Sequence, residues 1–258
     1  MRAIVTGGSS GVGRAVAVQL AKRGADVLAT ARRADRLAAL EHDWTARNQS
    51  GGSLQTLAGD QTDASFRTQL LTEAGNRLGG LDLLVLAAGS GAVGRFDASQ
   101  PETLRSTMEI DFFAPAELAR GSLPLLRKGR DPAIAFIGSI IGRHPLPLHL
   151  DYGAAKAAIA SLAIGLRMEL AASEIDVLLA TLGPTASEFW DNLIEGNRAS
   201  WSRGRAMPAE RAAHRILRGL VCRRREVVPG LQAKAYVLTS RLFPRLFDRC
   251  VIRRARAS

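Results

Sequence analysis

A short strand, a glycine-rich turn and a helix follow one another at the start of the chain. Ala3–Thr6 has the apolar, β-branched composition of a buried strand, and Gly7–Gly13 follows it directly. An alanine-rich helical pattern then continues to about Lys22. The first turn of a helix has free N–H groups and a partial positive charge, and glycines let a backbone approach a ligand closely. The arrangement predicts a site for a phosphate or pyrophosphate group at the turn.

The glycines of this turn have the spacing Gly-x-x-x-Gly-x-Gly rather than the commoner Gly-x-Gly-x-x-Gly. Taken on its own, the turn can also be interpreted as a purely structural glycine loop. The residues that we expect to contact a dinucleotide here are Gly7, Ser9, Ser10, Gly11, Val12 and Gly13.

Strand and helix patterns alternate along the rest of the chain. We predict strands at Ala3–Thr6, Asp26–Thr30, Ser53–Ala58, Leu83–Ala87, Ala133–Ile137, Asp176–Thr181 and Glu226–Val228. We predict helices at Gly13–Arg23, Ala34–Arg47, Ala64–Leu78, Thr103–Arg127, Tyr152–Ala172 and Ala209–Val221. Short buried strands that alternate with helices are typical of βαβ units. The predicted α/β fold is a Rossmann-like, doubly wound parallel sheet of about seven strands, flanked by helices on both faces, with ligands at the carboxyl ends of the strands.

Three residues in the second half of the chain can together move a proton on or off an oxygen atom. Tyr152 and Lys156 are four residues apart on a predicted helix and so share one face, and Ser139 lies upstream of them. A free phenol has a pKa near ~10, and we expect the neighbouring ammonium group to lower it toward neutral pH. The serine hydroxyl can hydrogen-bond a carbonyl or an alcohol. These groups predict acid–base catalysis of carbonyl reduction or alcohol oxidation, with hydride supplied by a cofactor.

These motifs, in this order, resemble those of the classical short-chain dehydrogenase/reductase family. Thr6–Gly13 is similar to the family's Thr-Gly-x-x-x-Gly-x-Gly turn, and Leu86–Gly89 is similar to its Asn-Asn-Ala-Gly turn. Ser139, Tyr152 and Lys156 match the family's catalytic serine, tyrosine and lysine. The resemblance covers nearly the whole chain. It implies a nicotinamide-dependent oxidoreductase in which Tyr152 is the general acid or base and Lys156 also binds the nicotinamide ribose.

The resemblance implies further contacts with the cofactor. Asp60 is similar to the family aspartate beside the adenine, although an aspartate there can also simply form a turn. Gly183–Ser187 is similar to the segment beside the nicotinamide. The implied contacts outside the glycine turn are Asp60, Gln61, Ala88, Gly89, Tyr152, Lys156, Gly183, Thr185 and Ser187.

The end of the second predicted strand bears on the choice between NADP(H) and NAD(H). An NAD site has a carboxylate there for the ribose 2′-hydroxyl, whereas an NADP site has a cation for the 2′-phosphate. This chain has Arg32 and Arg33 there and no acid. We therefore predict NADP(H) in preference to NAD(H), with Arg32 on the phosphate and Arg33 assisting it. The alternative for Arg32 is a solvated arginine at the start of a helix.

Several positions depart from the family's pattern. Asp111 stands where the family usually has an asparagine that helps to hold a water beside the lysine. An aspartate can hold the same water, or it can pair with Lys156 and change the pKa of the phenol, so we include Asp111 among the catalytic residues. Leu86 and Ala87 replace two asparagines, whose hydrogen bonds must then be absent or replaced, and Leu182 replaces a proline.

Apolar residues around the predicted polar centre favour an apolar ketone or secondary alcohol as the substrate. Phe189 and Trp190 follow the nicotinamide segment, and we assign them, with Ser139, to substrate binding. The other apolar or aromatic residues expected near the centre are Phe96, Leu146, Leu148 and Trp201. Some of these can instead close the core or an interface between subunits. His144 and His149 receive no role.

Composition favours one catalytic domain without a membrane span. The 258 residues are 47% hydrophobic, yet they contain no apolar run long enough to cross a bilayer, and the first residues lack a signal pattern. The two cysteines do not make a disulfide framework, and the four histidines lack metal-ligand spacing. We expect a single domain over residues 1–230, no metal, a cytoplasmic location and a homodimer or homotetramer.

The formal net charge is +11, and many of the arginines lie late in the chain. They are accompanied by no aromatic stacking motif or recognition-helix pattern, so we favour solubility and a charged tail over nucleic-acid binding. Residues 231–258 form a basic extension of the same domain with apolar residues at helical spacing, and we expect Pro244 to kink it. We favour packing over the substrate pocket or a subunit interface. The lesser alternative is a basic amphipathic helix on an anionic membrane surface.

These observations predict an NADP(H)-dependent oxidoreductase that interconverts a ketone or aldehyde and an alcohol. The alternative within the same class is a 3-oxoacyl-[acyl-carrier-protein] reductase, because an acidic partner would suit the basic surface. The alternative from another class is a cofactor-sensing or scaffold protein with little turnover. The intact Ser139, Tyr152 and Lys156 argue against that alternative, and Asp111 leaves it open.

Overall fold

The computed structural model describes residues 1–47, 51–197 and 206–256, in which seven strands form one sheet. The strand order is β3-β2-β1-β4-β5-β6-β7, and every strand is parallel to its neighbours. The strands are β1 (Arg2–Thr6), β2 (Asp26–Ala31), β3 (Leu54–Ala58), β4 (Leu83–Leu86), β5 (Ala133–Ser139), β6 (Asp176–Leu182) and β7 (Glu226–Val227). The predicted doubly wound parallel sheet is therefore confirmed.

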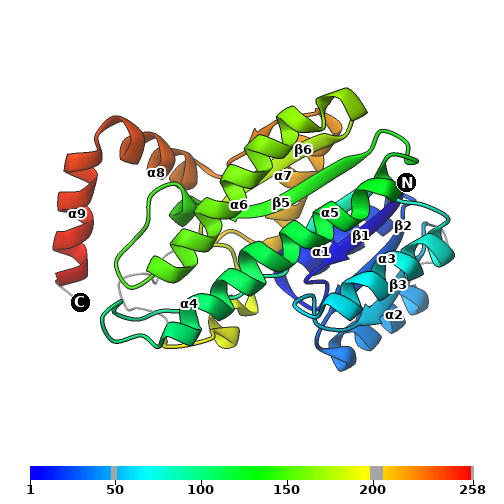
Figure 1. Cartoon of the computed structure of the whole chain (residues 1–258), viewed down its shortest axis with the longest axis horizontal. Coiled ribbons are helices and arrows are strands. Elements are labelled where there is room, and N and C mark those ends of the chain that lie inside the picture. The colour runs from blue at the N-terminus through cyan, green and yellow to red at the C-terminus, as the bar shows by residue number, and fades with distance from the viewer. Residues whose placement is uncertain (48–50, 198–205, 257–258) are drawn as a thin grey trace.

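Apolar side chains cover both faces of the sheet, because successive residues of a strand point to opposite faces. In β1, Ala3 and Val5 belong to one core and Ile4 to the other. The helices that close the first core are α1 (Gly11–Ala21), α2 (Ala34–Arg47) and α7 (Ala209–Val221). The helices that close the second are α3 (Ala64–Leu78), α5 (Ala114–Leu126) and α6 (Leu150–Glu169). Figure 1 shows helices on either side of the sheet.

The helix predicted over Thr103–Arg127 is interrupted. It begins as α4 (Pro101–Met108), widens into a π-helical turn at Glu109–Phe113 and continues as α5. The apolar pattern does not reveal this turn, because one extra residue in a single turn barely changes the periodicity of a long helix. The π-helical turn carries Asp111, whose side chain is buried.

The order of the strands reverses beside β1. From β1 the chain winds outward through β2 and β3, returns to β4 on the other side of β1, and continues to β7. The connections that leave β1 and β4 therefore run in opposite directions and leave a crevice between them. Ligands bind at such a switch point in open α/β sheets. The glycine turn follows β1, and Ala88 and Gly89 follow β4, so two of the predicted cofactor segments meet here.

The C-terminal extension forms two helices, α8 (Leu231–Leu242) and α9 (Pro244–Arg256). The expected kink at Pro244 is a complete break, because Phe243 is non-helical (φ −132°, ψ 58°) and proline is well suited to the first position of a new helix. Figure 1 shows the pair at one end of the molecule, with α9 set apart from the sheet. Within the described residues, no helix has the length and apolar character that a membrane span requires.

Candidate active site

One cavity of about 780 Å³ lies along the carboxyl ends of the strands and gathers all the residues assigned to catalysis, to the cofactor and to substrate binding. The predicted residues that line it are Gly7, Ser9, Ser10, Gly11, Val12, Gly13, Arg32, Arg33, Asp60, Gln61, Ala88, Gly89, Asp111, Ser139, Tyr152, Lys156, Gly183, Thr185, Ser187, Phe189 and Trp190. Motifs that are spread over most of the chain thus converge on one site.

The glycine turn contains contacts that only glycine permits. Gly7 has φ +71°, and a Cβ on Gly13 would lie 2.3 Å from the carbonyl oxygen of Gly7. The hydroxyl of Thr6 accepts hydrogen bonds from the N–H groups of Ala87 and Ala88 at 3.1 and 3.0 Å. These bonds join the turns after β1 and β4, and they stabilise the second turn, in which the asparagines expected from the resemblance are missing.

Arg33 reaches across the glycine turn. Its guanidinium donates to the hydroxyls of Ser9 and Ser10 at 3.1 and 3.0 Å, and it pairs with the carboxylate of Glu188 at 2.5 Å. The hydrogen bond from Arg33 lowers the pKa of Glu188. Arg32 lines the same cavity with an exposed side chain. Both predicted arginines therefore lie at the cofactor end, and Arg33 is the one that contacts the turn. Glu188 follows β6, and no spacing rule connects it with Arg33.

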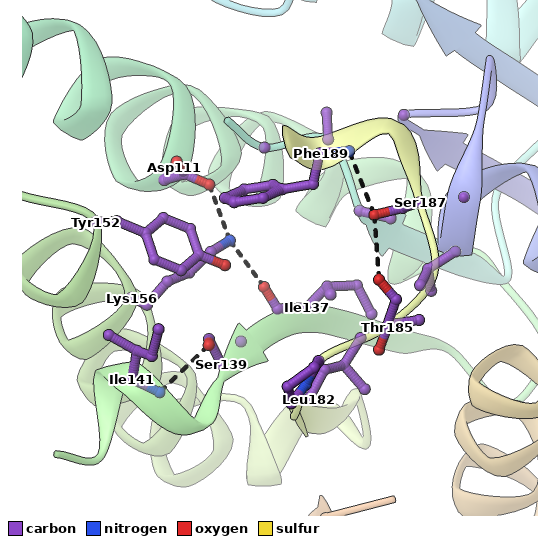
Figure 2. Close-up of a pocket in the computed structure, with 18 of the residues that line it drawn as sticks. Asp111, Ile137, Ser139, Ile141, Tyr152, Lys156, Leu182, Thr185, Ser187 and Phe189 are labelled. Atoms are coloured by element: carbon purple, nitrogen blue, oxygen red, sulfur yellow. Dashed lines mark hydrogen bonds and ion pairs between the residues drawn. The ribbon is translucent and has the colours of Figure 1, made fainter. Parts of the chain in front are cut away.

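Ser139, Tyr152 and Lys156 come together from two elements, as Figure 2 shows. Ser139 ends β5, whereas Tyr152 and Lys156 are one turn apart on α6. The Nζ atom of Lys156 lies 5.6 Å from the centroid of the Tyr152 ring and donates to the carbonyl oxygen of Ile137 at 3.1 Å. The Oγ atom of Ser139 accepts from the N–H of Ile141 at 3.2 Å, so the serine hydroxyl can still donate its own hydrogen.

A buried ion pair connects Lys156 with Asp111. The Nζ and Oδ1 atoms are 2.9 Å apart, and the two side chains are 7% and 0% exposed. The other oxygen of Asp111 accepts from the N–H of Ser90 at 3.3 Å. Gly89 makes room for the carboxylate, since a Cβ there would lie 2.5 Å from Oδ1. Of the two alternatives for Asp111, the structure contains the pair with Lys156.

The pKa of Tyr152 lies above its ordinary value of 10.0, which is the reverse of the lowering that we expected from Lys156. Burial of the phenol is the largest cause, and the negative charge of Asp111 adds to it. Lys156 and the hydroxyl of Ser139 act in the expected direction but are outweighed. The pKa of Lys156 is also raised, because Asp111 more than compensates for burial. Tyr152 is therefore a neutral phenol beside a charged ammonium group at neutral pH.

Phe189 and Trp190 form an apolar wall beside Tyr152. The ring centroid of Phe189 lies 5.2 Å from that of Tyr152 and 5.3 Å from that of Trp190. His149, which belongs to no recognised motif, is buried and lines the cavity, with its ring centroid 5.9 Å from that of Trp190. Burial lowers the pKa of His149 to about 4, so its ring is neutral. The wall is thus apolar with one neutral imidazole.

Some of the residues that we expected near the centre lie elsewhere. Phe96 is 64% exposed, and together with Leu148 it lines a separate small pocket. Leu146 lines the main cavity as expected. Trp201 is outside the described residues. Proximity along a loop does not determine where a side chain points, which explains why Phe96 and Leu148 lie outside the main cavity.

The C-terminal helices supply a wall of the cavity that no sequence motif indicated. The residues that line it are Gln232, Ala235, Tyr236 and Thr239 of α8 and Phe247, Cys250, Val251 and Arg254 of α9. The hydroxyl of Tyr236 donates to the carbonyl oxygen of His144 at 2.6 Å, and the His144 ring lies 2.8 Å from Asp248. These contacts fix the pair of helices to the loop before α6. Packing over the pocket, one of the alternatives for the extension, is therefore what the structure shows.

The cavity combines one end that suits an anion with one end that suits acid–base chemistry. Arginines and the start of α1 lie at the first, and Ser139, Tyr152 and Lys156 lie at the second. Across the part of the chain that the structure describes, no three His, Cys, Asp or Glu side chains are grouped so as to hold a metal ion. The groups present suit proton transfer next to a bound dinucleotide.

Comparison with known sequences points in the same direction. A family profile described as short chain dehydrogenase matches residues 1–198. The chain is 35% identical over 184 residues to the uncharacterized oxidoreductase YhxD of Bacillus subtilis (strain 168), covering 71% of this chain and 60% of YhxD. It is 30% identical over 252 residues to hydroxysteroid 11-beta-dehydrogenase 1-like protein A of Xenopus laevis, covering 95% of this chain and 83% of that protein. The chain thus spans less than two thirds of the length of YhxD.

Solved structures share the fold. A short-chain dehydrogenase from Streptomyces avermitilis has a TM-score of 0.83 at 27% identity, over 95% of this chain and 93% of that one. One from Sphingobium yanoikuyae, in complex with NADPH, has a TM-score of 0.77 at 27% identity, over 90% and 89%. One from Burkholderia phymatum, in complex with NAD, has a TM-score of 0.83 over 95% and 94%. At 20% identity this last likeness shows the fold alone.

Proposed function

The chain belongs to the short-chain dehydrogenase family, and on that basis we propose that it is an NADP(H)-dependent oxidoreductase that interconverts a ketone or aldehyde and an alcohol. The observation that carries the proposal is the convergence of Ser139, Tyr152 and Lys156 on the cavity that also contains the glycine turn and two arginines. A proton donor and a dinucleotide site are the two parts that this reaction needs.

The residues around the cavity fit a dinucleotide. The glycine turn leads directly into α1, which begins at Gly11 (φ +54°). The free N–H groups of the first helical turn therefore lie at the glycine turn. They would hold a pyrophosphate, and Arg32 and Arg33 would hold a phosphate on the adenosine ribose. Lys156 would donate to the nicotinamide ribose. When bound, the nicotinamide would supply or accept the hydride.

The chain's own groups would supply the proton for reduction. The hydroxyl of Ser139 would donate to the substrate oxygen and orient it, and the phenol of Tyr152 would protonate that oxygen as negative charge develops on it. Lys156 would stabilise the phenolate that is left. Because the pKa of Tyr152 is raised, the phenol is in the protonated form that reduction needs.

Charge favours NADP(H) over NAD(H). No acid follows β2, where Ala31, Arg32 and Arg33 are found, and an NAD site needs an acceptor for the ribose 2′-hydroxyl there. The carboxylate that Glu188 brings to this end is paired with Arg33 rather than presented to a ribose hydroxyl. The Sphingobium relative, solved with NADPH, supports the same choice.

The walls of the cavity favour an apolar substrate. Phe189, Trp190, Leu146 and the neutral His149 surround the catalytic end. A 3-oxoacyl thioester on an acidic carrier protein is the second candidate, because Arg254 places a cation in the cavity wall and the chain is basic. The homo-oligomer and the cytoplasmic location stay predictions.

The test is oxidation of NADPH, read as loss of absorbance, with aliphatic, aromatic, steroid and acyl-thioester ketones offered in turn. Tyr152→Phe keeps the ring and removes only the hydroxyl, so turnover should fall by about 10²-fold or more while NADPH binding stays nearly unchanged. Tyr236→Phe is the matched control, since it removes the other phenol hydroxyl that lines the cavity. Full activity of Tyr152→Phe would contradict the mechanism. Absence of turnover with every ketone would favour the cofactor-sensing or scaffold alternative.

A further inference from the structure

The outer face of α8 exposes a row of leucines. Leu231, Leu238 and Leu242 are 86%, 57% and 58% exposed. They are seven and four residues apart, so they form one line along the helix, which we call the leucine stripe. Phe243, just after α8, and Leu246 on α9 are also exposed and enlarge the apolar surface. Single exposed apolar residues are ordinary, but a contiguous apolar surface marks a site of interaction.

Basic residues and the cavity flank the leucine stripe on its two sides. With about 100° of rotation per residue, Lys234 and Arg241 fall on one side of the stripe. Ala235 and Thr239, which line the cavity, fall on the other side. Around the circumference of α8, a basic side is therefore followed by the leucine stripe and then by the side that lines the cavity.

α9 likewise has one side that lines the cavity and an opposite side that is basic and exposed. Phe247 and Val251 line the cavity, whereas Arg245, Arg249 and Arg253 fall on the opposite side of the helix and are exposed. Residues 231–256 contain seven lysines and arginines and a single acid, Asp248. The outer surface of the two helices thus combines exposed apolar residues with a strong positive charge.

These properties distinguish between the partners that could cover this surface. In a symmetric dimer the same patch faces its own copy, so the positive charges of α8 and α9 would oppose one another. An acidic protein would satisfy the charge, but it would not require a row of exposed leucines along a single helix. The surface of an anionic bilayer meets both features, since basic side chains lie among its headgroups and apolar ones enter the acyl region.

We propose that α8 and α9 dock this protein on an anionic phospholipid surface. The leucine stripe enters the boundary of the acyl chains, and Lys234, Arg241 and the outer arginines of α9 contact the headgroups. Because the cavity wall adjoins the stripe, docking brings the cavity close to the bilayer. If the proposed function holds, the substrate class is an apolar carbonyl compound or alcohol dissolved in the membrane.

Vesicle flotation with the full chain tests the docking without any need for turnover. Phosphatidylcholine vesicles with and without phosphatidylglycerol are compared at low and high salt, and binding is expected only to the anionic vesicles and should weaken with salt. A variant with Leu231→Ser, Leu238→Ser and Leu242→Ser should bind about tenfold or more weakly. Lys234→Glu with Arg241→Glu should lose binding similarly.

The matched control replaces exposed apolar residues outside the extension. Met168→Ser with Val221→Ser removes two such side chains from α6 and α7 and should bind vesicles like the unmodified protein. Equal binding by the leucine variant, or no binding to anionic vesicles, would overturn the proposal. A dimer in sedimentation velocity that the leucine variant abolishes would assign the surface to a second copy instead. Binding of an acidic acyl-carrier protein without vesicle binding would assign it to a protein partner.

A second measurement separates the docking from the proposed activity. NADPH oxidation is followed with a short, water-soluble methyl ketone and with a long-chain methyl ketone dissolved in anionic vesicles. The leucine variant should keep its rate with the short ketone and lose rate only with the long one. Equal rates of the two proteins with the long ketone would refute delivery from the membrane. Lack of turnover with either ketone would count against the proposed function, while flotation would still decide the docking.

Discussion

At the scale of single residues, the carboxylate of Asp111 lies 2.9 Å from the ammonium of Lys156 in the interior of the protein. There it stabilises the ammonium and raises the pKa of Tyr152, because a phenolate would be repelled by its negative charge. A neutral phenol suits proton donation, whereas a phenolate is the base that alcohol oxidation needs. In the proposed reaction, Asp111 would therefore help to set the pH dependence of each direction.

Replacing Asp111 by asparagine removes the charge and keeps a side chain that can hydrogen-bond. The pKa of Tyr152 should fall, since burial still raises it but Asp111 no longer does. In alcohol oxidation, the increase in rate with pH should then occur at lower pH, which a profile of kcat/KM against pH measures. Asp111→Leu leaves Lys156 buried without its partner and should lose activity and about 3–5 kcal/mol of stability. Superimposable profiles together with an active Asp111→Leu would show that Asp111 serves only local packing.

The two arginines after β2 should determine the choice of cofactor. Arg33 already donates to the glycine turn, and Arg32 lines the same end of the cavity. Loss of a charge-assisted hydrogen bond should weaken NADPH binding by about tenfold to 10²-fold in Arg33→Ala, with little effect on NADH. Arg32→Asp should erase or reverse the preference. Fluorescence titration gives the dissociation constants, and Arg23→Gln, an exposed arginine after α1 that does not line the cavity, is the control. Equal affinity of the unmodified protein for NADPH and NADH would refute the assignment.

At the scale of elements, the segment after β6 connects the two ends of the cavity. Its short 3₁₀-helix Glu188–Asn192 is capped by Ser187, whose hydroxyl accepts from the N–H of Phe189 at 3.4 Å. Within this turn Glu188 pairs with Arg33 at the cofactor end, and the next residue, Phe189, packs on Tyr152 at the catalytic end. Two neighbouring residues of one short turn thus make a contact at each end of the cavity.

Glu188→Gln should increase the preference for NADPH. A 2′-phosphate bound to Arg33 would meet the carboxylate of Glu188, which lies 2.5 Å from the guanidinium and opposes a second negative charge there. Removing that charge should strengthen NADPH binding by a few-fold to about tenfold and leave NADH binding nearly unchanged. The ratio of the two dissociation constants is the measurement. An unchanged ratio would mean that the pair is only a surface ion pair.

At the scale of the whole molecule, the two ends of the sheet differ in role. The cavity lies at the carboxyl ends of the strands. At the amino ends, Asp82, which precedes β4, connects neighbouring segments. Asp82 accepts from the guanidinium of Arg2 at 2.6 Å and from the N–H of Arg130 at 2.8 Å. It therefore ties together the segments that begin β1, β4 and β5. Because it is far from the cavity in the topology, its effect should be on stability alone.

Acid should remove the stabilisation by Asp82. Burial would raise its pKa, but the hydrogen bonds from Arg2 and Arg130 outweigh this and bring the pKa to about 2. A carboxyl whose folded pKa lies below its unfolded value stabilises the fold above the unfolded value. That contribution, about 2 kcal/mol here, is lost as the pH falls from about 4 to about 2. Asp82→Asn should lower the free energy of unfolding in urea at neutral pH by at least this amount, with a gap to the unmodified protein that narrows toward acid. If the difference in free energy of unfolding between the two proteins did not change with pH, this explanation would be contradicted.

Local sequence patterns were sufficient to predict the sheet, the glycine turn, the order of the elements and the candidate catalytic residues. These features depend on local periodicity, on the backbone freedom of glycine and on the four-residue spacing that places Tyr152 and Lys156 on one face of a helix. Such signals are short-range, and the fold that they predict was confirmed for every strand. The resemblance to the family also marked Asp111 as a departure from the usual asparagine.

Which charged groups pair and which side chains line the cavity depend on the tertiary fold. The pairs Arg33–Glu188 and Asp111–Lys156 join residues that lie far apart in the chain, so no spacing pattern contains them. The direction of the Tyr152 pKa shift depends on burial, which exists only once the core has closed. The place of α8 and α9 beside the cavity likewise follows from how the break at Phe243 directs the second helix. Local patterns specify elements, whereas solvent exclusion and long-range contacts specify the chemistry of the site.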